Sequence, residues 1–277
     1  MNERVGIIGG GAMGAGIAEV CLRGGSRVLV TEPNAPAWAR LKDRLEQSLT
    51  KQPVAAGRDQ VMSSLERVDG LQDLRDCGLV IEALPEDREL KRRVLHEVSS
   101  VIDPSAVLAS NTSSIPLADL AESVARPDRF LGIHFFNPAP VMGLVELIPT
   151  LLTAASCVEA VAKFVRDTLG KEPVTAPDQS GFIVNALLVP YLLSAARMRD
   201  AGLASAADID SAMEKGCNHP MGPLRLMDMI GLDVIVGVAD SLHAEFATAS
   251  TVAPPALRRM VQAGFLGRKS GRGFYDY

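Results

Sequence analysis

The sequence predicts an α/β domain built on a mostly parallel sheet, followed by an all-helical domain. Short apolar runs alternate with helical patterns from the amino terminus to about residue 178, and such alternation is typical of a parallel sheet with helices on both faces. After residue 180 only helical patterns follow until the tail. The length of 277 residues fits two domains, which we expect at 1–180 and 181–277.

The first domain contains seven predicted strands and five predicted helices. Short, apolar and mostly β-branched runs predict strands at 4–9, 27–32, 78–84, 106–112, 129–137, 143–149 and 172–178. Apolar residues at helical spacing predict helices at 12–24, 36–49, 58–66, 86–102 and 154–169. The pair Gly24-Gly25 marks the end of the first helix.

The second domain reads as three long helical segments. The first covers 181–202, the second covers 205–216 and begins with Ser205 as a capping residue, and the third covers 222–246. No internal repeat or low-complexity segment interrupts them.

The composition is that of a folded protein without a nucleic-acid or membrane surface. Hydrophobic residues make up 47% of the chain and charged residues 22%, with a net charge of −5 spread over interleaved acids and bases. Residues 5–22 are apolar, but Glu19 and the many glycines argue against a membrane helix. No signal-peptide pattern is present, so we expect a cytoplasmic protein.

The four cysteines, Cys21, Cys77, Cys157 and Cys217, are far apart in the sequence. They form no CxxC pair and no spacing typical of a zinc site. We therefore expect four reduced, buried thiols and no metal.

A glycine-rich motif joins the first predicted strand to the first predicted helix. Gly9, Gly11 and Gly14 fit G-x-G-x-x-G at the start of a strand–helix–strand unit. Gly9 permits the tight turn, Gly11 lets a pyrophosphate reach the backbone, and Gly14 lets the helix pack closely on the sheet. The N–H groups at the helix start favour the phosphate charge. The motif predicts a dinucleotide-binding domain of the Rossmann type.

Glu32 ends the second predicted strand, 18 residues after Gly14. A carboxylate there can accept hydrogen bonds from a ribose diol and would repel a 2′-phosphate, so NAD is expected rather than NADP. A nicotinamide cofactor implies hydride transfer. Hydride transfer at an alcohol needs a group that takes up the hydroxyl proton, and histidine suits this role at neutral pH.

His134 is the best candidate for this proton carrier. His96 and His243 lie on helices beside glutamates, where exposed positions are expected, and His219 precedes a proline in a loop. His134 lies toward the carboxyl end of a buried strand, where open α/β sheets bind ligands. Glu146 lies inside the next apolar strand and needs a partner there. A strand–turn–strand arrangement would let Glu146 orient the imidazole and stabilise its protonated form.

The polar run SNTSS at 110–114 follows the preceding strand and offers hydroxyl groups to a reacting oxygen. It occurs together, in this order, with GGGAMGAGIA, GIHFFNPAPVMGLVEL, GFIVNALLVPYL, HPMGPLRLMDMIGLD and GRKSGRGFYDY. Over essentially its whole length the chain resembles the 3-hydroxyacyl-CoA dehydrogenase family, and in particular its bacterial 3-hydroxybutyryl-CoA members.

The resemblance implies hydride transfer between NAD and the hydroxyl carbon of a short hydroxyacyl thioester. His134 matches the catalytic histidine and Glu146 its partner, while Ser113 and Asn185 match residues near the substrate. The implied cofactor-binding residues are Gly9, Gly11, Ala12, Met13, Gly14, Glu32, Glu86, Lys91, Asn111, Asn137 and Lys269. The resemblance also implies a homodimer formed through the helical domain.

The sequence departs from the family pattern at three places. Glu32 stands where aspartate is usual, and Gly143 stands where related sequences often carry lysine. The segment 40–60 keeps Lys42, Arg44, Lys51 and Arg58, but Pro53 interrupts it and no Lys-Lys cluster remains. Because the 3′-phosphate of coenzyme A favours positive charge, these losses weaken the case for free coenzyme A.

Three alternatives to a dehydrogenase of coenzyme A thioesters therefore stay open at the level of sequence. The hydroxyacyl group, for example a glyceryl group, could be tethered to an acyl carrier protein, which has the same phosphopantetheine arm without the adenosine phosphates. The substrate could be a free hydroxy acid. The chain could also be a non-catalytic dinucleotide binder, although the set Ser113, His134, Glu146 and Asn185 argues against that interpretation.

Overall fold

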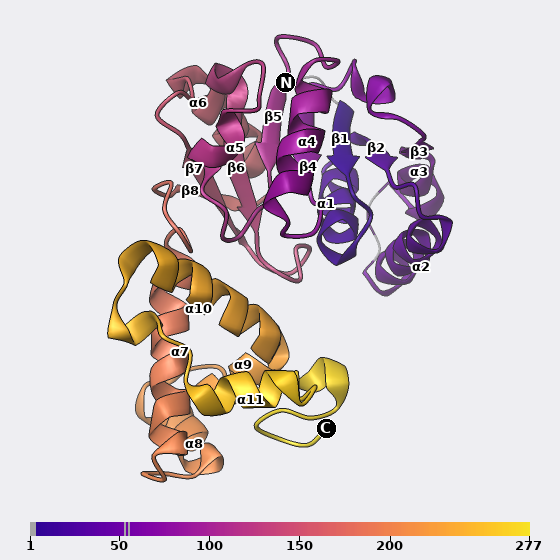
Figure 1. Cartoon of the computed structure of the whole chain (residues 1–277). Helices are drawn as coiled ribbons and strands as arrows, with labels where there is room; N and C mark the ends of the chain where they lie inside the picture. The colour runs from indigo at the N-terminus through magenta and orange to yellow at the C-terminus, as the bar shows by residue number, and fades with distance from the viewer. Residues whose placement is uncertain (1–3, 53, 55) are drawn as a thin grey trace. The chain divides into compact units, whose positions relative to one another are not determined.

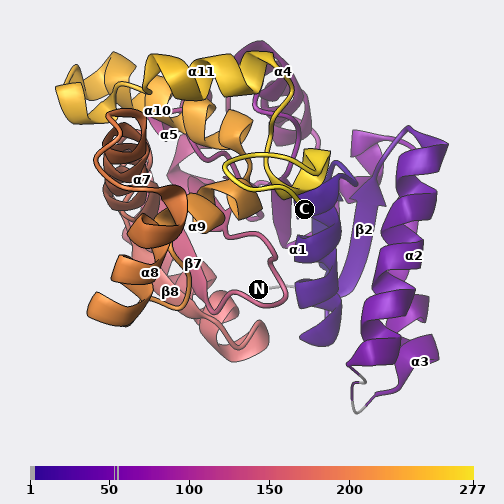
Figure 2. The same ribbon diagram turned by 90° about the horizontal axis from the view of Figure 1, so that it is seen from below.

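A computed structural model describes residues 4–52, 54 and 56–277. The chain divides into two compact units between Asp178 and Gln179. The first unit contains a sheet layered between helices, and the second consists of helices (Figures 1 and 2).

The sheet of the first unit has eight strands in the order β3-β2-β1-β4-β5-β6-β7-β8. Their bounds are β1 Arg4–Ile8, β2 Arg27–Thr31, β3 Leu65–Val68, β4 Leu79–Glu82, β5 Val107–Ser110, β6 Phe130–Phe135, β7 Leu144–Pro149 and β8 Glu172–Thr175. Strands β1 to β6 are parallel, β7 is antiparallel to β6, and β8 is parallel to β7. The predicted mostly parallel sheet is confirmed.

Helices cover both faces of this sheet. They are α1 Ala12–Arg23, α2 Ala35–Lys51, α3 Arg58–Ser63, α4 Arg88–Ser99, α5 Leu117–Ala121 and α6 Ala155–Lys163, with short turns at η1 Leu71–Leu74, η2 Pro127–Arg129 and η3 Phe164–Thr168. Side chains of α1, α2 and α6 share one apolar core with one face of the strands. On the other face, Gly132 of β6 lies directly against Leu117 of α5, with α4 beside α5 (Figure 1).

The strand order reverses between β1 and β4, and the carboxyl ends of these two strands lie side by side. From β1 the chain runs outward to β2 and β3, and it then returns to the opposite side of β1 as β4. Open α/β sheets bind ligands at this reversal of strand order. The glycine motif follows β1 and Glu86 follows β4, so both lie at this edge.

The second unit has its own apolar core, which includes Leu192, Leu224, Met227 and Leu242. Its helices are α7 Val184–Asp200, α8 Ala206–Gly216, α9 Pro223–Ile230, α10 Leu232–Phe246 and α11 Pro255–Gln262, with short turns at η4 Ala249–Thr251 and η5 Arg268–Ser270. The predicted cap is confirmed, because the Ser205 hydroxyl accepts a hydrogen bond from the Asp208 amide at 3.1 Å. Among the described residues, none of the helices has the length and apolar character that crossing a bilayer requires.

Three predictions about local structure are wrong. Residues 65 and 66 belong to β3 rather than to the helix predicted at 58–66, because the LERV segment pairs with β2 at the edge of the sheet. The helix predicted at 222–246 is broken at Gly231, whose φ of +109° is incompatible with a right-handed helix. Cys217 is exposed, whereas Cys21, Cys77 and Cys157 are buried; all four are free thiols.

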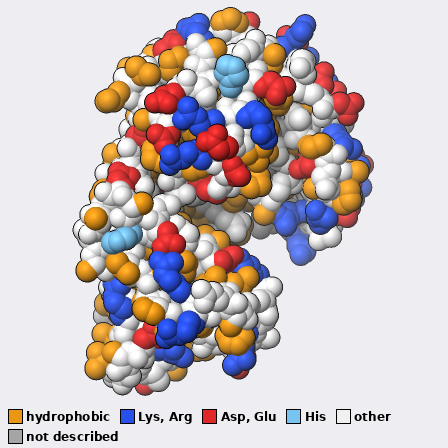
Figure 3. Space-filling model, viewed as in Figure 1, with side chains coloured by type: hydrophobic (Ala, Val, Ile, Leu, Met, Phe, Trp, Pro, Cys, Tyr) orange, Lys and Arg blue, Asp and Glu red, His pale blue; other side chains and the backbone are white. Residues whose placement is uncertain are grey.

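The surface shown in Figure 3 carries acidic and basic side chains side by side. Along α4, for example, Arg88 pairs with Asp119 at 2.9 Å and Arg92 with Glu122 at 3.2 Å. This face of the molecule therefore carries mixed charge, as the interleaved sequence predicts.

Candidate active site

The glycine motif forms a tight turn that leaves open space at one position. Gly9 has a φ of +103°, and a Cβ on Gly14 would collide with the carbonyl oxygen of Gly9, so the chain itself requires both glycines. A Cβ on Gly11, in contrast, would meet no atom within 4 Å. Gly11 thus borders space outside the chain, next to the amino terminus of α1, where phosphate charge is favoured.

The Glu32 carboxylate is fixed beside this turn. Its Oε2 accepts a hydrogen bond from the Gly10 amide and its Oε1 from the Asn34 amide, each at 2.8 Å. Each oxygen keeps further acceptor capacity for a ribose diol. The open position at Gly11 and the fixed carboxylate at Glu32 fit the pyrophosphate and ribose of NAD, and the negative charge disfavours a 2′-phosphate.

His134 and Glu146 face each other across adjacent antiparallel strands. They are directly opposite in the β6–β7 register, and His134 Nδ1 lies 2.8 Å from Glu146 Oε2. Both side chains are buried, with 5% and 0% of their surface exposed. The predicted contact between them is confirmed. With Nδ1–H donated to the carboxylate, the neutral ring presents Nε2 as a proton acceptor.

Ser113 lies on the other side of the imidazole. Its hydroxyl is 3.2 Å from His134 Nε2, and the residue is half-buried, so the accepting nitrogen faces the partly open end of the sheet. The Phe136 ring packs edge-on at 4.6 Å between centroids and limits movement of the imidazole. Glu146 thus holds Nδ1 of the imidazole, and Ser113 lies at Nε2, the nitrogen that can take up a proton.

Glu86 organises the backbone that carries Ser113. One of its oxygens accepts hydrogen bonds from the Thr112 hydroxyl at 2.6 Å, from the Ser113 amide at 2.9 Å, and from the amide and hydroxyl of Ser114 at 2.9 Å. Burial alone would raise the pKa of Glu86, but the charge of Lys91 and these donors outweigh it and lower the pKa below its ordinary value. Glu86 therefore stays ionised.

The remaining predicted residues fall into two groups. In the first unit, Asn111 accepts a hydrogen bond from the Phe135 amide at 2.9 Å, while Asn137 is exposed just after β6. In the second unit, Asn185 is half-buried in the first turn of α7, and the ammonium of Lys269 lies 2.6 Å from Asp233. The structure brings Ser113, His134 and Glu146 together, and the roles of Asn185 and Lys269 stay predictions.

Comparison with known proteins accounts for both units. Residues 4–179 match the NAD-binding domain of 3-hydroxyacyl-CoA dehydrogenase, and residues 181–277 match its C-terminal domain. The chain is 49% identical to a 3-hydroxybutyryl-CoA dehydrogenase of Mycobacterium tuberculosis, over 99% of this chain and 98% of that protein. The chain belongs to the 3-hydroxyacyl-CoA dehydrogenase family.

Solved structures of this dehydrogenase family support the same assignment. The crystal structure of Mycobacterium tuberculosis FadB2 superposes with a TM-score of 0.97 at 48% identity, covering 99% of each chain. That of the Ralstonia eutropha (S)-3-hydroxybutyryl-CoA dehydrogenase superposes with a TM-score of 0.92 at 40% identity, also covering 99% of each chain. The protein is thus an NAD-dependent oxidoreductase of this family.

The other three histidines of this family member lie on the surface. His96, His219 and His243 are all exposed. His96 contacts the Ser123 carbonyl oxygen at 3.0 Å on the surface, as its position on a charged helix predicts. His134 is the one histidine among the described residues that is buried, which leaves it as the candidate proton carrier.

One predicted cofactor residue of this dehydrogenase also has partners within the protein, and its cofactor role stays a prediction. The resemblance places Lys91 around the dinucleotide; its side chain is 1% exposed, and its ammonium lies 2.7 Å from Glu82. Sequence reasoning missed Glu82, although the same signal that singles out Glu146, a carboxylate inside an apolar run, is present in GLVIEAL. Ser110, the first residue of the SNTSS run, donates its hydroxyl to Glu82 at 2.6 Å, a contact that the sequence did not predict.

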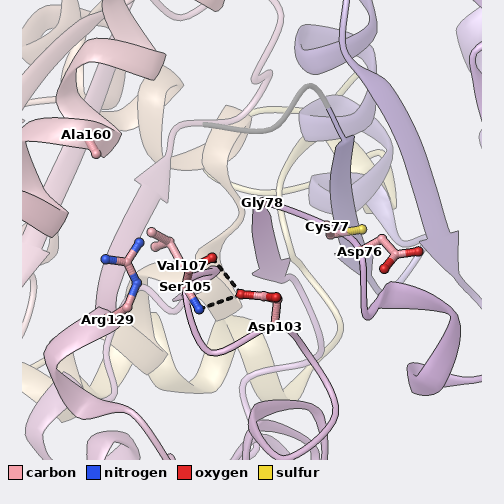
Figure 4. Close-up of a pocket in the computed structure, with 8 residues that line it drawn as sticks. All are labelled: Asp76, Cys77, Gly78, Asp103, Ser105, Val107, Arg129 and Ala160. Carbon is pink, nitrogen blue, oxygen red and sulfur yellow. Dashed lines mark hydrogen bonds between the residues drawn. The ribbon is translucent and has the colours of Figure 1, made fainter.

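A cavity of about 380 Å³ lies at the opposite edge of the sheet (Figure 4). Its lining includes Asp76, Asp103 and Arg129, which precede β4, β5 and β6 respectively. These positions are at the amino ends of the strands, whereas His134 and the glycine motif lie toward the carboxyl ends. The cavity is therefore separate from the dehydrogenase site.

Proposed function

We propose that this protein oxidises a short 3-hydroxyacyl thioester of the 3-hydroxybutyryl-CoA type, with NAD as hydride acceptor, and catalyses the reverse reduction. The observation that supports this most directly is the buried Glu146–His134 pair, whose Nε2 points toward Ser113. The family assignment of both units supports the class of substrate.

The first unit holds the dinucleotide with residues already placed for it. The backbone around Gly11 receives the pyrophosphate, and Glu32 accepts hydrogen bonds from the adenosine ribose. When bound, NAD supplies the carbon that accepts or returns the hydride. The protein's own part in the chemistry is then to position the alcohol and to move its proton.

His134 is the general base of the oxidation. Its Nε2 would take the hydroxyl proton and the ring would become an imidazolium, while bound NAD would supply the acceptor for the hydride that leaves the same carbon, so that the alcohol becomes a ketone. Glu146 holds the ring orientation and stabilises this positive charge. The Ser113 hydroxyl holds the reacting oxygen, while a substrate contact of Asn185 is what the family resemblance implies. In the reduction, His134 returns the proton.

We infer that coenzyme A is the carrier, although the chain has fewer cations than its relatives often have. Gly143 brings no charge near β7, and Pro53 lies outside the described residues. Arg44 and Lys42 on α2 are exposed, as is Arg58 on α3, and these side chains can meet the nucleotide phosphates.

We also propose a homodimer formed through the helical unit and a cytoplasmic location, which the four free thiols fit.

The test is the rate of NADH formation with four substrates, three of which share the 3-hydroxybutyryl group. We expect turnover with 3-hydroxybutyryl-CoA and little with free 3-hydroxybutyrate, which lacks the thioester arm. A carrier protein loaded with the same 3-hydroxybutyryl group, and one loaded with a glyceryl group, complete the series. If the protein turns over either tethered substrate faster than the coenzyme A thioester, the carrier of the acyl group is a carrier protein and not coenzyme A. No turnover of any substrate would overturn the proposed function.

A further inference from the structure

We propose that Asp178, the last residue of the first unit, holds the amino end of α5 and thereby positions the Ser113 hydroxyl at His134. The inference rests on the function proposed above, because the place of Ser113 matters for turnover only if His134 transfers a proton. It gives a positioning role to a carboxylate that is distant from Ser113 in the sequence.

Helix α5 takes its amino-terminal cap from another part of the chain. It begins after Pro116, whose side chain has no hydrogen-bonding atom and cannot cap it. The first amides of a helix have no acceptor within the helix. Asp178 supplies both acceptors, because its Oδ1 accepts from the Leu117 amide at 2.7 Å and its Oδ2 from the Ala118 amide at 2.8 Å. A tertiary contact therefore fixes the start of α5.

The start of α5 also lies against the strand that carries His134. A Cβ on Gly132 of β6 would lie 3.1 Å from Leu117 Cδ2, so the leucine packs directly on the strand. Leu117 has no exposed surface. Gly132 and His134 are two positions apart in β6 and share one face of the sheet. The first turn of α5 is thus placed on the face of the sheet from which the imidazole projects.

Ser113 lies between this helix and the Glu86 carboxylate. Glu86 accepts a hydrogen bond from the Ser113 amide at 2.9 Å, and residues 114–116 alone separate Ser113 from Leu117. Because this connection is so short, a displacement of the start of α5 moves the Ser113 hydroxyl, which lies 3.2 Å from His134 Nε2. Glu86 holds one side of the segment, and Asp178 holds the other.

Asp178 is also the point at which the chain leaves the first unit. The residues that follow belong to the second unit, where the Ser180 amide donates a hydrogen bond to Glu245 at 2.7 Å. A loss of the Asp178 carboxylate could therefore act through α5 or through the linker. The experiment has to separate these two routes, and Pro116 offers the means, because a serine there would give α5 a cap of its own.

The test compares D178N, S113A, S113A/D178N, P116S and P116S/D178N in the full-length protein. In D178N an amide nitrogen, which cannot accept a hydrogen bond, replaces one of the two acceptor oxygens. The kcat with 3-hydroxybutyryl-CoA, the Kd of NADH and the Tm are measured for each variant.

The matched control is D210N in the second unit. Asp210 caps the start of α9 in the same manner, because its two oxygens accept from the Leu224 and Arg225 amides at 2.8 and 3.1 Å. D210N therefore reports what the loss of one acceptor from such a cap does by itself, and we expect a lower Tm with kcat within about twofold of wild type.

We expect D178N to lower kcat about tenfold while the Kd of NADH changes less than about twofold, because a small displacement near the reacting atoms costs rate. In the S113A background, D178N should change kcat less than about twofold, since the group that it positions is gone. P116S/D178N should recover kcat at least about threefold above D178N, because the serine hydroxyl again caps α5.

Three results would overturn the inference. A kcat of D178N within about twofold of wild type would leave Asp178 as a helix cap without a part in turnover. An equal loss of kcat from D178N with and without the Ser113 hydroxyl would place its effect elsewhere. A lack of recovery in P116S/D178N would mean that the carboxylate acts through the linker.

If D178N does not fold, P116S/D178N is compared with P116S. A kcat within about threefold of P116S then supports the inference, and a loss of about tenfold despite the new cap overturns it. Wild-type protein without dehydrogenase activity would instead reject the proposed function, before any variant is compared.

Discussion

Glycine and carboxylate residues occur together in two regions of the molecule, but their roles differ. The two regions are the glycine motif of the first unit and the carboxyl-terminal tail of the second unit, residues 267–277. Both are rich in glycine and each lies beside a carboxylate, which is the partly buried Glu32 for the glycine motif and the buried Asp228 for the tail. Gly11 borders open space, whereas a Cβ on Gly267 or Gly273 would collide with Asp228. Glycine makes room for an outside molecule in the first unit and for the chain's own carboxylate in the second.

The groups that bond the carboxylates also differ between the first unit and the tail of the second unit. Glu146 and Glu82 bond His134 and Lys91, whose protons or charges can act at the dinucleotide edge. Asp228 accepts hydrogen bonds from the Phe274 and Tyr275 amides at 2.9 and 3.0 Å and from the Tyr277 hydroxyl at 3.1 Å. A buried acid is therefore no sign of catalysis by itself. The chemistry of its partner decides the role.

The largest effect is expected where a carboxylate bonds a proton carrier. H134Q should lower kcat about 10²- to 10⁴-fold, because no group of suitable basicity then takes up the hydroxyl proton. The Kd of NADH should stay within about twofold, since His134 does not hold the dinucleotide. Steady-state kinetics and fluorescence titration with NADH measure the two quantities. Near-full activity in H134Q would remove His134 from the mechanism.

Substitution by alanine distinguishes a glycine that borders open space, Gly11, from one that contacts Asp228, Gly273. G11A should raise the Kd of NADH about a hundredfold, or about 2.8 kcal/mol, and leave Tm unchanged, because the new Cβ meets no protein atom. G273A should lower Tm and leave NADH binding unchanged, because its Cβ meets Asp228. An unchanged Kd in G11A would mean that no ligand approaches that residue.

Asp228 should matter for stability rather than for turnover. In D228N an amide nitrogen replaces one acceptor oxygen and leaves a buried N–H of the tail unpaired, so the free energy of unfolding should fall by about 2 kcal/mol. Urea denaturation measures this change, and kcat should stay within about threefold of wild type. A loss of kcat without a loss of stability would contradict the structural role given to the tail.

The smallest expected effect is a difference between two variants, D228N and E86Q, in how the loss of unfolding free energy changes with pH. Burial raises the pKa of Asp228, its amide and tyrosyl donors lower it in part, and the net shift is upward. Its contribution is then fully present at low pH and is lost as pH rises through the raised pKa, so the cost of D228N should shrink with rising pH. Glu86, with its lowered pKa, stabilises above its ordinary pKa and loses this effect as pH falls, so the cost of E86Q should grow with rising pH.

Urea denaturation of wild type, D228N and E86Q between about pH 3 and pH 7 measures both trends. Parallel trends in the two variants would show that the two carboxylates do not differ in environment.

Much of the fold and of the site follows from local pattern. The helix cap at Ser205, the turn at Gly9 and the pairing of His134 with Glu146 rest on short-range rules: hydroxyl capping, positive φ, and an ionisable residue inside an apolar strand. The failures have non-local causes. Residues 65–68 form a strand only because β2 offers an edge, and the break at Gly231 depends on how α9 and α10 pack around it.

The sequence by itself determined the alternation of strands and helices in the first unit, the division near residue 180, the nucleotide turn and the candidate for the proton carrier, because each depends on residue type and on spacing along the chain. Tertiary structure alone decided what the buried carboxylates of Glu82 and Asp228 bond. Glu82 bonds Lys91, nine residues away in sequence, and also Ser110 at the end of a neighbouring strand. Burial and partner arise when distant segments meet, so the tail on Asp228 and the support behind Ser113 could be recognised only in the folded chain.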